Sequence, residues 1–335
     1  MTGRLYIDGY DAYREYGVFV RGENGYNELI AFPSLKSVDS NDWQEEDGIE
    51  ADLSQPVLDT KSFQLPVATS YADTRWYRLI ERLSDGSYHT FDFRHIGLSF
   101  RLRLESVTPS DRLGSLALMA LKLSDDFPLV GYRFAAPVSA MPYDDSYTLD
   151  GVAMSSYGVR VLRGTLSEIT KTPEVKANML RNIKTLSGAI YDPKTVTYKS
   201  KDVKLYCLMT AATLSGLWRN WWALLYNLTQ PEERSLFVDA IEQAFPCYYK
   251  SCQVTEFYVE GKIWLAFTLT LTMTHDFRIE EGDVVLAAET GSVVLTQQTD
   301  DAVDLRRLYN IRGGVRLVTS QVMRLTSYGN IRFNN

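Results

Sequence analysis

The sequence is poor in cysteine and histidine, and it has no long apolar run. The three cysteines, Cys207, Cys247 and Cys252, cannot all pair, so we expect reduced thiols and synthesis in a cytosolic compartment. No apolar run approaches the roughly 20 residues that a membrane-spanning helix needs, so we expect no membrane span. The first residues, MTGRLYIDGYD, lack the apolar segment of a secretory signal, and we expect none.

Catalytic and cofactor motifs are also missing from the sequence. The three histidines show no metal-binding spacing such as HExxH, and there is no GxSxG, Walker or GxGxxG motif. Cys247 and Cys252 are too few for a zinc site unless distant ligands join them. If both lie on one strand, their odd separation would place them on opposite faces. Asp125 and Asp126 could form a carboxylate pair, although a strand end explains them better. We therefore expect no enzyme, no metal and no cofactor.

The charge balance bears on possible nucleic-acid partners. The formal net charge is −7, which argues against a protein that grips nucleic acid through its phosphates. The same charge is compatible with a protein that DNA passes without sticking to it. Apolar content of 45% and charged content of 23% are typical of a globular protein, and 335 residues suffice for two domains with cores of their own.

The sequence contains one stretch that occurs twice. Residues 48–65 align without a gap to residues 188–205, at an offset of 140 positions (188 − 48 = 140). The matching residues are Gly48 and Gly188, Asp52 and Asp192, Lys61 and Lys201, and Leu65 and Leu205. Flanking segments repeat in the same order, because each copy opens with an Asp-Gly pair between alternating residues, a strong hairpin signal. We expect a strand, a turn and a second strand ending near Arg21 in the first copy, and the same in the second.

Each copy then offers one amphipathic helix. We expect Asp73 and Ser215 as N-caps, Gly86 as the C′ residue of the first helix, and Pro231 after the second. The apolar faces are Trp76, Leu79, Ile80 and Leu83 in the first copy, and Trp218, Trp221, Leu225 and Leu228 in the second. This spacing indicates helices packed on a sheet, so the tryptophans are interpreted as core residues and not as a base-stacking platform.

Alternating strands close each copy. Residues 98–104 and 265–273 alternate as half-buried strands do, and Glu260-Gly261 is the expected turn of a hairpin. Residues 235–245 fit a helix by length and a strand by position, and we favour the strand. Asp126-Phe127 is matched to Asp276-Phe277 as the end of the closing strands.

The long connections at about 23–48 and 165–188 differ in the sign of their charge. Loops of this length usually have a task. The candidate contact residues are Asp39, Asp42, Glu45, Glu46, Asp47 and Glu50 on the acidic side, and Lys171, Lys176, Arg181 and Lys184 on the basic side. Two interpretations stay open. They are solvated loops that have diverged, or the acidic loop contacts a basic loop on a neighbouring domain, because complementary potential fixes register.

These patterns predict four regions. They are a first domain at 1–127, a proline-punctuated linker at 128–146, a second domain at 147–277, and a C-terminal extension at 278–335. In the extension we expect short strands at 284–288, 292–297, 314–321 and 322–327 around a turn of helix at 302–309.

The order of elements resembles the tail-tube fold of bacteriophage tube, distal-tail and baseplate-hub proteins. The resemblance covers residues 5–127 and 147–277 and rests on the Asp-Gly openings, the long loop, the single helix and the closing strands. It implies a mainly β (α+β) chain with two tandem antiparallel β-sandwich or barrel-like tail-tube domains. Each domain has one packed α-helix, and a small β-rich C-terminal extension follows.

The resemblance also implies a function. We expect a structural virion protein that forms a ring of the phage tail, as distal tail or tail tube component, around a lumen for DNA. Two fused units need only three chains for a six-domain ring, so we predict a homotrimer, with a hexamer as the alternative. The implied partners are adjacent tail or baseplate proteins, with DNA only as passing cargo, in a virion tail assembled in the host bacterial cytoplasm. The alternatives are a baseplate hub protein and a carbohydrate- or receptor-binding β-module of a tail tip.

Overall fold

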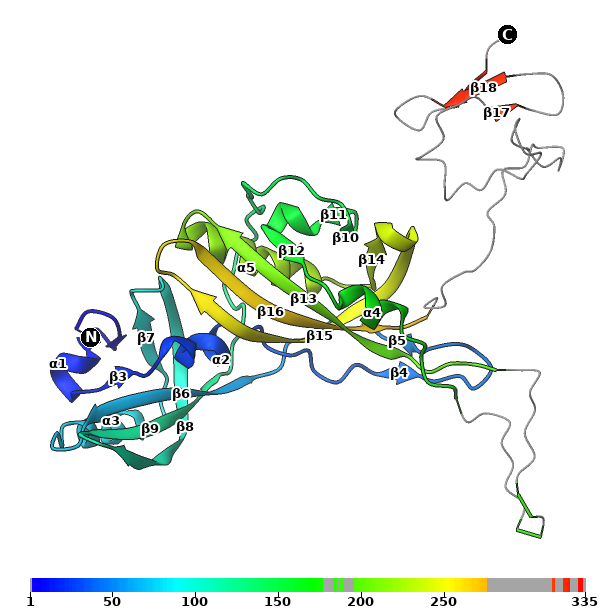
Figure 1. Cartoon of the computed structure of the whole chain (residues 1–335). Helices are drawn as coiled ribbons and strands as arrows, with labels where there is room; N and C mark the ends of the chain where they lie inside the picture. The colour runs from blue at the N-terminus through cyan, green and yellow to red at the C-terminus, as the bar shows by residue number, and fades with distance from the viewer. Residues whose placement is uncertain are drawn as a thin grey trace. The chain divides into compact units, whose positions relative to one another are not determined.

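The computed structural model describes residues 2–176, 184–185, 187–188 and 196–275, together with strands at 315–316, 322–325 and 331–333. The chain divides into two compact units, Met1–Phe277 and Arg278–Asn335, which are described separately. Figure 1 shows that antiparallel strands dominate the larger unit, with few helices. The mainly β class predicted from the sequence is confirmed.

The first sheet of the larger unit has seven strands in the order β2-β1-β7-β8-β9-β6-β3. In chain order these strands are β1 (Tyr6–Ile7), β2 (Tyr10–Asp11), β3 (Phe19–Val20), β6 (Lys61–Ser70), β7 (His89–Phe93), β8 (Leu98–Leu113) and β9 (Leu116–Asp125). The helical segments between them are α1 (Ala12–Tyr16), the 3-10 helix η1 (Glu23–Tyr26), α2 (Asn27–Ile30) and α3 (Trp76–Leu83). All neighbouring strands in this sheet pair antiparallel.

The second sheet has seven strands in the order β11-β10-β14-β15-β16-β13-β12. Its strands are β10 (Tyr147–Leu149), β11 (Val152–Ala153), β12 (Val159–Val161), β13 (Lys201–Ala211), β14 (Arg234–Val238), β15 (Gln243–Tyr258) and β16 (Ile263–Met273). Its helical segments are η2 (Met154–Tyr157), α4 (Thr165–Thr170), α5 (Leu214–Leu228) and η3 (Asp239–Ile241). Every strand has a counterpart at the same place in the first sheet, so the repeated sequence coincides with a repeated topology. The domain boundaries remain predictions, because both sheets belong to one compact unit.

The Asp-Gly pairs form the expected hairpin turns. Asp8 and Gly9 have φ of 48° and 83°, and Asp150 and Gly151 have φ of 50° and 76°, as a type I′ turn requires. Each aspartate also accepts a backbone N–H from the neighbouring strand: Thr90 N donates to Asp8 over 2.9 Å, and Ser235 N donates to Asp150 over 2.8 Å. The tip of each hairpin is therefore tied to the next strand of its own sheet.

The predicted long second strand ending near Arg21 is wrong. After the hairpin the chain forms α1, because the Asp11 side chain caps it by accepting from Tyr13 N and Arg14 N over 3.0 Å. Gly17 ends α1 with φ of 70°. Only then does β3 pair with β6 on the far side of the sheet. In the second copy η2 and β12 take the same places.

The helices form where they were predicted, but their caps differ. The residue before α3 is Arg75 and not Asp73, and α3 ends at Leu83 with Ser84 as its C-cap. For α5 the capping side chain is Thr213, which accepts from Gly216 N over 3.1 Å. In both helices the predicted N-cap lies within two residues of the observed one, because several Ser, Thr and Asp residues stand near each start.

The closing strands confirm the predicted alternation. Side chains at 265, 267, 269, 271 and 273 of β16 are all buried, and the β15–β16 hairpin turns at Gly261 with φ of 97°. Residues 235–245 form β14, the short η3 and the start of β15, so the preferred strand interpretation holds for most of the segment.

A β-bulge in β15 overturns one prediction about the cysteines. Cys247 pairs with Met273 and Cys252 pairs with Leu269, positions that share a face of β16. The bulge between Tyr249 and Ser251 adds one residue and resets the alternation, so the odd separation does not place the two thiols on opposite faces. β8 carries a bulge at the matching place.

The register also corrects the alignment of the strand ends. β6 pairs Lys61 with Asp125, and β13 pairs Lys201 with Met273, so the structural offset of the last strand is 148 (273 − 125 = 148). Thr274 is therefore the counterpart of Asp126. The predicted match of Asp126-Phe127 to Asp276-Phe277 is therefore two residues out of register, and Asp276 and Phe277 themselves lie outside the described residues.

In the smaller unit, three described strands form an antiparallel sheet in the order β17-β18-β19. They are β17 (Val315–Arg316), β18 (Val322–Leu325) and β19 (Ile331–Phe333). The strands predicted at 314–321 and 322–327 overlap β17 and β18. The segments predicted at 284–288, 292–297 and 302–309 lie outside the described residues.

Candidate assembly surfaces

Two long arms connect the opening hairpins to the long strands. We call residues 33–60 the first arm and residues 173–200 the second arm. Within Met1–Phe277, we call the part built on the first sheet the first unit and the part built on the second sheet the second unit. At the base of each arm one antiparallel bridge closes it, between Leu35 and Leu58 and between Val175 and Tyr198. Both bridge residues are again 140 positions apart, so the arms leave their sheets in the same way. The first arm continues through β4 (Ser40–Asn41) and β5 (Glu50–Ala51), which pair with each other.

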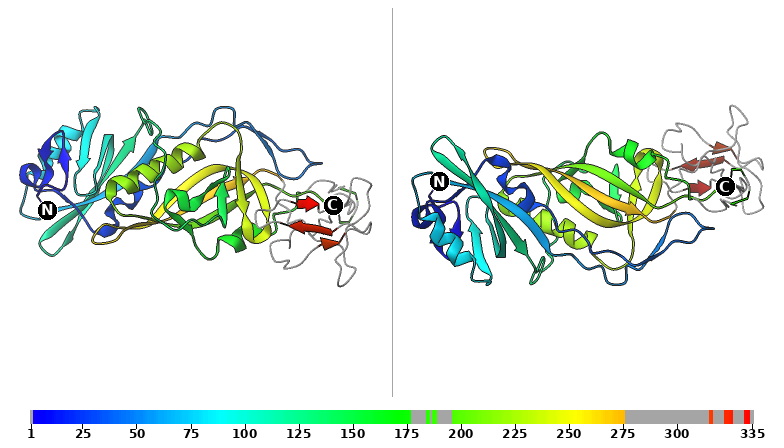
Figure 2. Two further views of the ribbon diagram at one scale, coloured as in Figure 1. Left: turned by 90° about the horizontal axis from the view of Figure 1, so that it is seen from above. Right: turned by 90° about the horizontal axis from the view of Figure 1, so that it is seen from below.

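The first arm lies along the second sheet, as Figures 1 and 2 show. Leu35 N donates to Lys250 O over 3.0 Å, at the bulge of β15. Further along, Gly48 N donates to Tyr198 O over 2.7 Å, and Ile49 N donates to Thr274 O over 2.8 Å. The arm thus extends the hydrogen-bonded edge of the second unit with its own backbone.

Gly48 fits this contact because it has no side chain. Its φ is 75°, and a Cβ there would lie 1.6 Å from Thr274 O. No other residue can approach that carbonyl so closely in this conformation. The glycine that marked the repeat in the sequence is therefore required by a close backbone approach between the arm and the second sheet.

A buried lysine of the second unit holds the tip of the first arm. The Lys176 side chain is 4% exposed. Its Nζ donates to Trp43 O over 2.6 Å and to Gly48 O over 2.7 Å, and it forms an ion pair with Asp42 at 2.5 Å. Tyr198 N donates to the carboxylate of Asp47 over 2.8 Å. These bonds satisfy a cation and several backbone groups that would be costly to bury alone.

Among the predicted contact residues, the structure brings Asp42, Asp47 and Lys176 together, and it does so within one chain. Glu50 accepts locally from Trp43 Nε1 over 3.2 Å. The remaining described candidates are exposed: Asp39, Glu45, Glu46, Lys171 and Lys184. Arg181 lies outside the described residues. A role of these residues between molecules remains a prediction.

The doubled lysines Lys61 and Lys201 have a role that the sequence did not reveal. Lys61 Nζ donates to Leu29 O over 2.5 Å and also to Ala31 O, at the end of α2. Lys201 Nζ donates to Lys171 O over 2.8 Å and also to Ile169 O, at the end of α4. Each lysine caps the carbonyl end of a short helix at the start of an arm. Their identical spacing was the only sequence signal for this role.

Burial changes the acidity of both capping lysines. Desolvation lowers the pKa of Lys61 to about 7 and that of Lys201 to about 8. Asp125 partly offsets this at Lys61 by favouring the charged form.

Two tryptophans of α5 also join the second unit to the first. Trp221 is fully buried, its Nε1 donates to Ile30 O over 3.1 Å, and its ring stacks on Phe32 at a centroid distance of 3.8 Å. Trp218 Nε1 donates to Ile96 O over 2.6 Å. The prediction that these tryptophans are core residues is confirmed, and their N–H groups bond across the junction of the two sheets.

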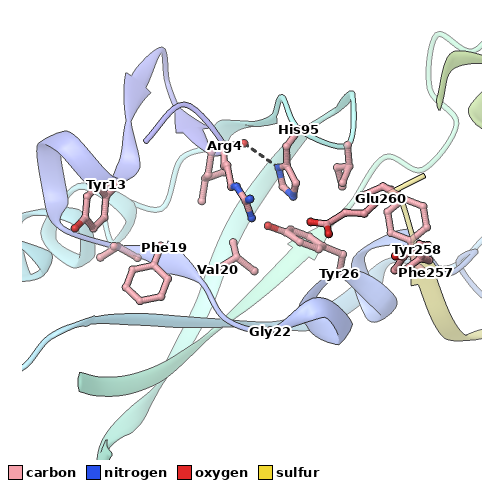
Figure 3. Close-up of a pocket in the computed structure, with 14 residues that line it drawn as sticks. Arg4, Tyr13, Phe19, Val20, Gly22, Tyr26, His95, Phe257, Tyr258 and Glu260 are labelled. Carbon is pink, nitrogen blue, oxygen red and sulfur yellow. Dashed lines mark hydrogen bonds between the residues drawn. The ribbon is translucent and has the colours of Figure 1, made fainter. Parts of the chain in front are cut away.

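A pocket of about 350 Å³ lies where the two sheets meet, lined on one side by Arg4 and Tyr26 and on the other by residues 257–260 (Figure 3). His95 Nδ1 lies 3.2 Å from Arg4 O, and the rings of His95 and Tyr26 lie 4.9 Å apart. Burial lowers the pKa of His95 and raises that of Tyr26 to about 12. With Nδ1 facing a carbonyl, a neutral His95 serves there as a hydrogen-bond donor.

Catalytic and metal chemistry finds no further support in the described part of the chain. There, no group of three or more His, Cys, Asp or Glu side chains could hold a metal ion. The pKa values of Asp125 and Asp126 shift in opposite directions. Burial raises the pKa of Asp125, and the hydrogen bond from Arg103 lowers that of Asp126 to about 2. Burial raises the pKa of Cys247 and of Cys252 to about 12, so both thiols stay protonated. None of the described helices is long and apolar enough to cross a membrane.

The chain resembles a solved structure, although the similarity is weak. No protein-family model matches the chain, and no curated protein matches it. Among solved structures, the chain is similar to SPP1 Dit (gp 19.1), whose crystal structure is described as a paradigm of the hub adsorption apparatus in phages that infect Gram-positive bacteria. The identity is 12% and the TM-score 0.27, over 81% of this chain and 98% of that one.

Proposed function

We propose that the chain is a structural protein of a bacteriophage tail, and that its copies form a ring around a lumen for DNA as a distal tail or tail tube component. The observation that carries the proposal is one seven-stranded order that occurs in both sheets. The repeat includes the arms, and the first arm seats on the second unit. This arrangement supports the resemblance to tail-tube proteins, which rests on the same order of elements.

The proposed ring has a physical reason. Each sheet is open, with the short strands β2 and β3 or β11 and β12 at its edges. Open edges invite pairing with other chains, and closure into a ring removes them. The chain supplies two units in tandem, so three copies give six units with approximate sixfold symmetry, while a hexamer of chains would give twelve.

The proposal includes the surroundings of the ring. A net charge of −7 suits a lumen that DNA traverses without binding, because like charge repels the phosphates. Adjacent tail or baseplate proteins are the proposed partners, in a virion tail assembled in the cytoplasm of a bacterial host.

Mass measurement of the purified chain tests the proposal. We expect a particle of three times the chain mass of 38.1 kDa by sedimentation or native mass spectrometry, with a central hole in electron micrographs. Six copies would support the hexamer instead. A chain that stays monomeric at micromolar concentration would refute the ring. Micrographs of the native particle then separate a stacked tube from a single distal ring or a spike-bearing hub.

A further inference from the structure

The site on which the first arm seats has a counterpart in the first unit, and no described residue occupies it. In the second unit, the N–H and C=O of Tyr198 both receive partners from the first arm, Asp47 and Gly48. Leu58 occupies the same place at the base of the first unit, at an offset of 140. The bonds beside it match as well, since Lys36 N donates to Val57 O over 2.9 Å as Lys176 N does to Thr197 O over 2.8 Å. These two bonds therefore occupy equivalent positions in the two copies of the repeat.

The geometry of the bridge leaves the Leu58 backbone pointing outward. Leu35 and Leu58 are flanked by the bonds Lys36 N–Val57 O and Asp59 N–Ser34 O, so they form the non-hydrogen-bonded kind of antiparallel pair. In such a pair the N–H and C=O of each residue face away from the partner strand. Among the described residues no backbone donor bonds Leu58 O, and the neighbouring Val57 is 52% exposed. Tyr198 bonds the first arm through its outward-facing N–H and C=O, and at Leu58 the C=O has no such backbone partner among the described residues.

The second arm has the parts that would fill this edge. Gly188 has φ of 87°, close to the 75° of Gly48, but no atom lies within 4 Å of a Cβ built there. Lys36 stands at the place of Lys176 and is exposed, whereas Lys176 is buried under the first arm. Val175, which corresponds to Leu35, is 48% exposed. Both the donor and the receptor are present in the chain, and among the described residues none covers Gly188 or bonds Leu58 O.

The helices show the same asymmetry. The face of α5 with Trp218 and Trp221 is buried against the first unit. At the corresponding place in the first unit, α3 exposes the ring of Tyr77, which is 60% accessible beside Trp76. Within the described part of the chain, Tyr77 of α3 therefore has no covering neighbour like the one that buries Trp218 and Trp221 of α5.

We propose that the second arm of one copy seats on the first unit of a second copy, in the way that the first arm seats on the second unit within the chain. This inference rests on the ring proposed above and names its contact. Gly188 N donates to Leu58 O of the second copy, as Gly48 N donates to Tyr198 O within the chain. Lys36 Nζ of the second copy donates to Gly188 O, as Lys176 Nζ donates to Gly48 O within the chain. The contact is head-to-tail, so repeated application closes a ring or propagates a filament.

Gly188→Ala tests the close approach. In the free chain the added methyl group meets no atom, so the fold is strained only by the left-handed φ. Gly86→Ala is the matched control, because Gly86 has φ of 78° and equally open space around it. We expect Gly188→Ala to raise the dissociation constant of the assembly at least tenfold and the control to leave it within twofold. Equal assembly of the two variants would overturn the contact.

A cross-linking experiment identifies the partners directly. A chain with Ser187→Cys is mixed with a chain with Leu58→Cys, because these positions correspond to Asp47 and Tyr198, which are in contact within the chain. Mild oxidation should give a disulfide-linked dimer in the mixture and none in either chain alone. Asp47→Cys combined with Tyr198→Cys is the positive control and should give a bond within one chain.

The outcomes separate the two proposals. A three-copy particle that gives no Ser187–Leu58 cross-link while the positive control reacts would refute the arm contact and leave the ring standing. In a chain that carries both Ser187→Cys and Leu58→Cys, a bond between these positions within a single monomer would also refute it. A chain that never assembles would refute the ring and the contact together.

Discussion

Replacement of Gly48 by alanine should release the first arm from the second unit. The residue is buried, and the two backbone bonds Gly48 N–Tyr198 O and Ile49 N–Thr274 O flank the point of closest approach. Because a Cβ at Gly48 would stand 1.6 Å from a backbone oxygen, no side-chain rotation relieves the clash. The arm must therefore move as a whole.

The cost follows from the contacts that this movement breaks. The left-handed φ of 75° costs an L-residue about 1 kcal/mol relative to glycine. Loss of the two backbone bonds adds about 1 kcal/mol each. Lys176 also loses Gly48 O, which leaves part of a buried cation without a partner. We expect the free energy of unfolding to fall by about 3–5 kcal/mol in Gly48→Ala.

Urea denaturation measures this loss, and limited proteolysis locates it. Gly86→Ala provides the control, since it has the same sign of φ but open space, and it should lose only about 1 kcal/mol. New cleavage sites in residues 39–50 of Gly48→Ala alone would show that the arm has come off. Equal losses in the two variants, or an intact arm in both, would refute the close approach as the reason for the glycine.

Three further substitutions probe the same junction. Lys61 has a folded pKa of about 7 against about 10.4 unfolded, so between these values the unfolded state binds more protons and stability rises with pH. Lys61→Met should therefore reduce the rise in urea midpoint between pH 7 and 9, and an unchanged rise would contradict this. Trp221→Phe leaves Ile30 O without its indole donor and should cost about 1–3 kcal/mol by thermal unfolding. An unshifted midpoint would show that the bond is dispensable. Lys176→Met removes the donor of two carbonyls and should cost about 2–4 kcal/mol in urea. The exposed Lys199→Met serves as its control and should cost less than about 0.5 kcal/mol; a similar loss in both would refute the role of Lys176.

Local rules explain why most strands and both main helices were predictable. The alternation in β16 and the helical spacing of Trp218 and Trp221 arise from burial on one face, which the sequence records directly. Asp8-Gly9 and Asp150-Gly151 adopt the positive φ values that a tight hairpin needs. These features depend on neighbours within a few positions, and so a single sequence reveals them.

The errors come from contacts between distant parts of the chain. The bulge in β15 depends on its pairing with β16, and no residue within the strand gives a sequence signal for it. Lys61 and Lys201 look like surface charges in the sequence, but both are only half-exposed, and each donates to the carbonyl end of a helix about 30 positions earlier in the chain. The charge reversal between the arms suggested a contact of opposite loops. It could not show that Asp42 meets Lys176 within the same chain.

The proposed arm contact between copies should be weaker than the arm contact within the chain. Within the chain, Asp42 adds an ion pair to Lys176, and Thr197 Oγ1 donates to Gln44 O over 2.9 Å. At the corresponding positions of the proposed contact between copies stand Asn182 and Val57, which supply neither a charge nor a hydroxyl. Loss of a charge-assisted bond and a neutral one makes that contact weaker. The first arm then docks as the chain folds, whereas the second arm engages only when a neighbouring copy offers Leu58 and Lys36. A difference in this direction keeps each arm on its own receptor.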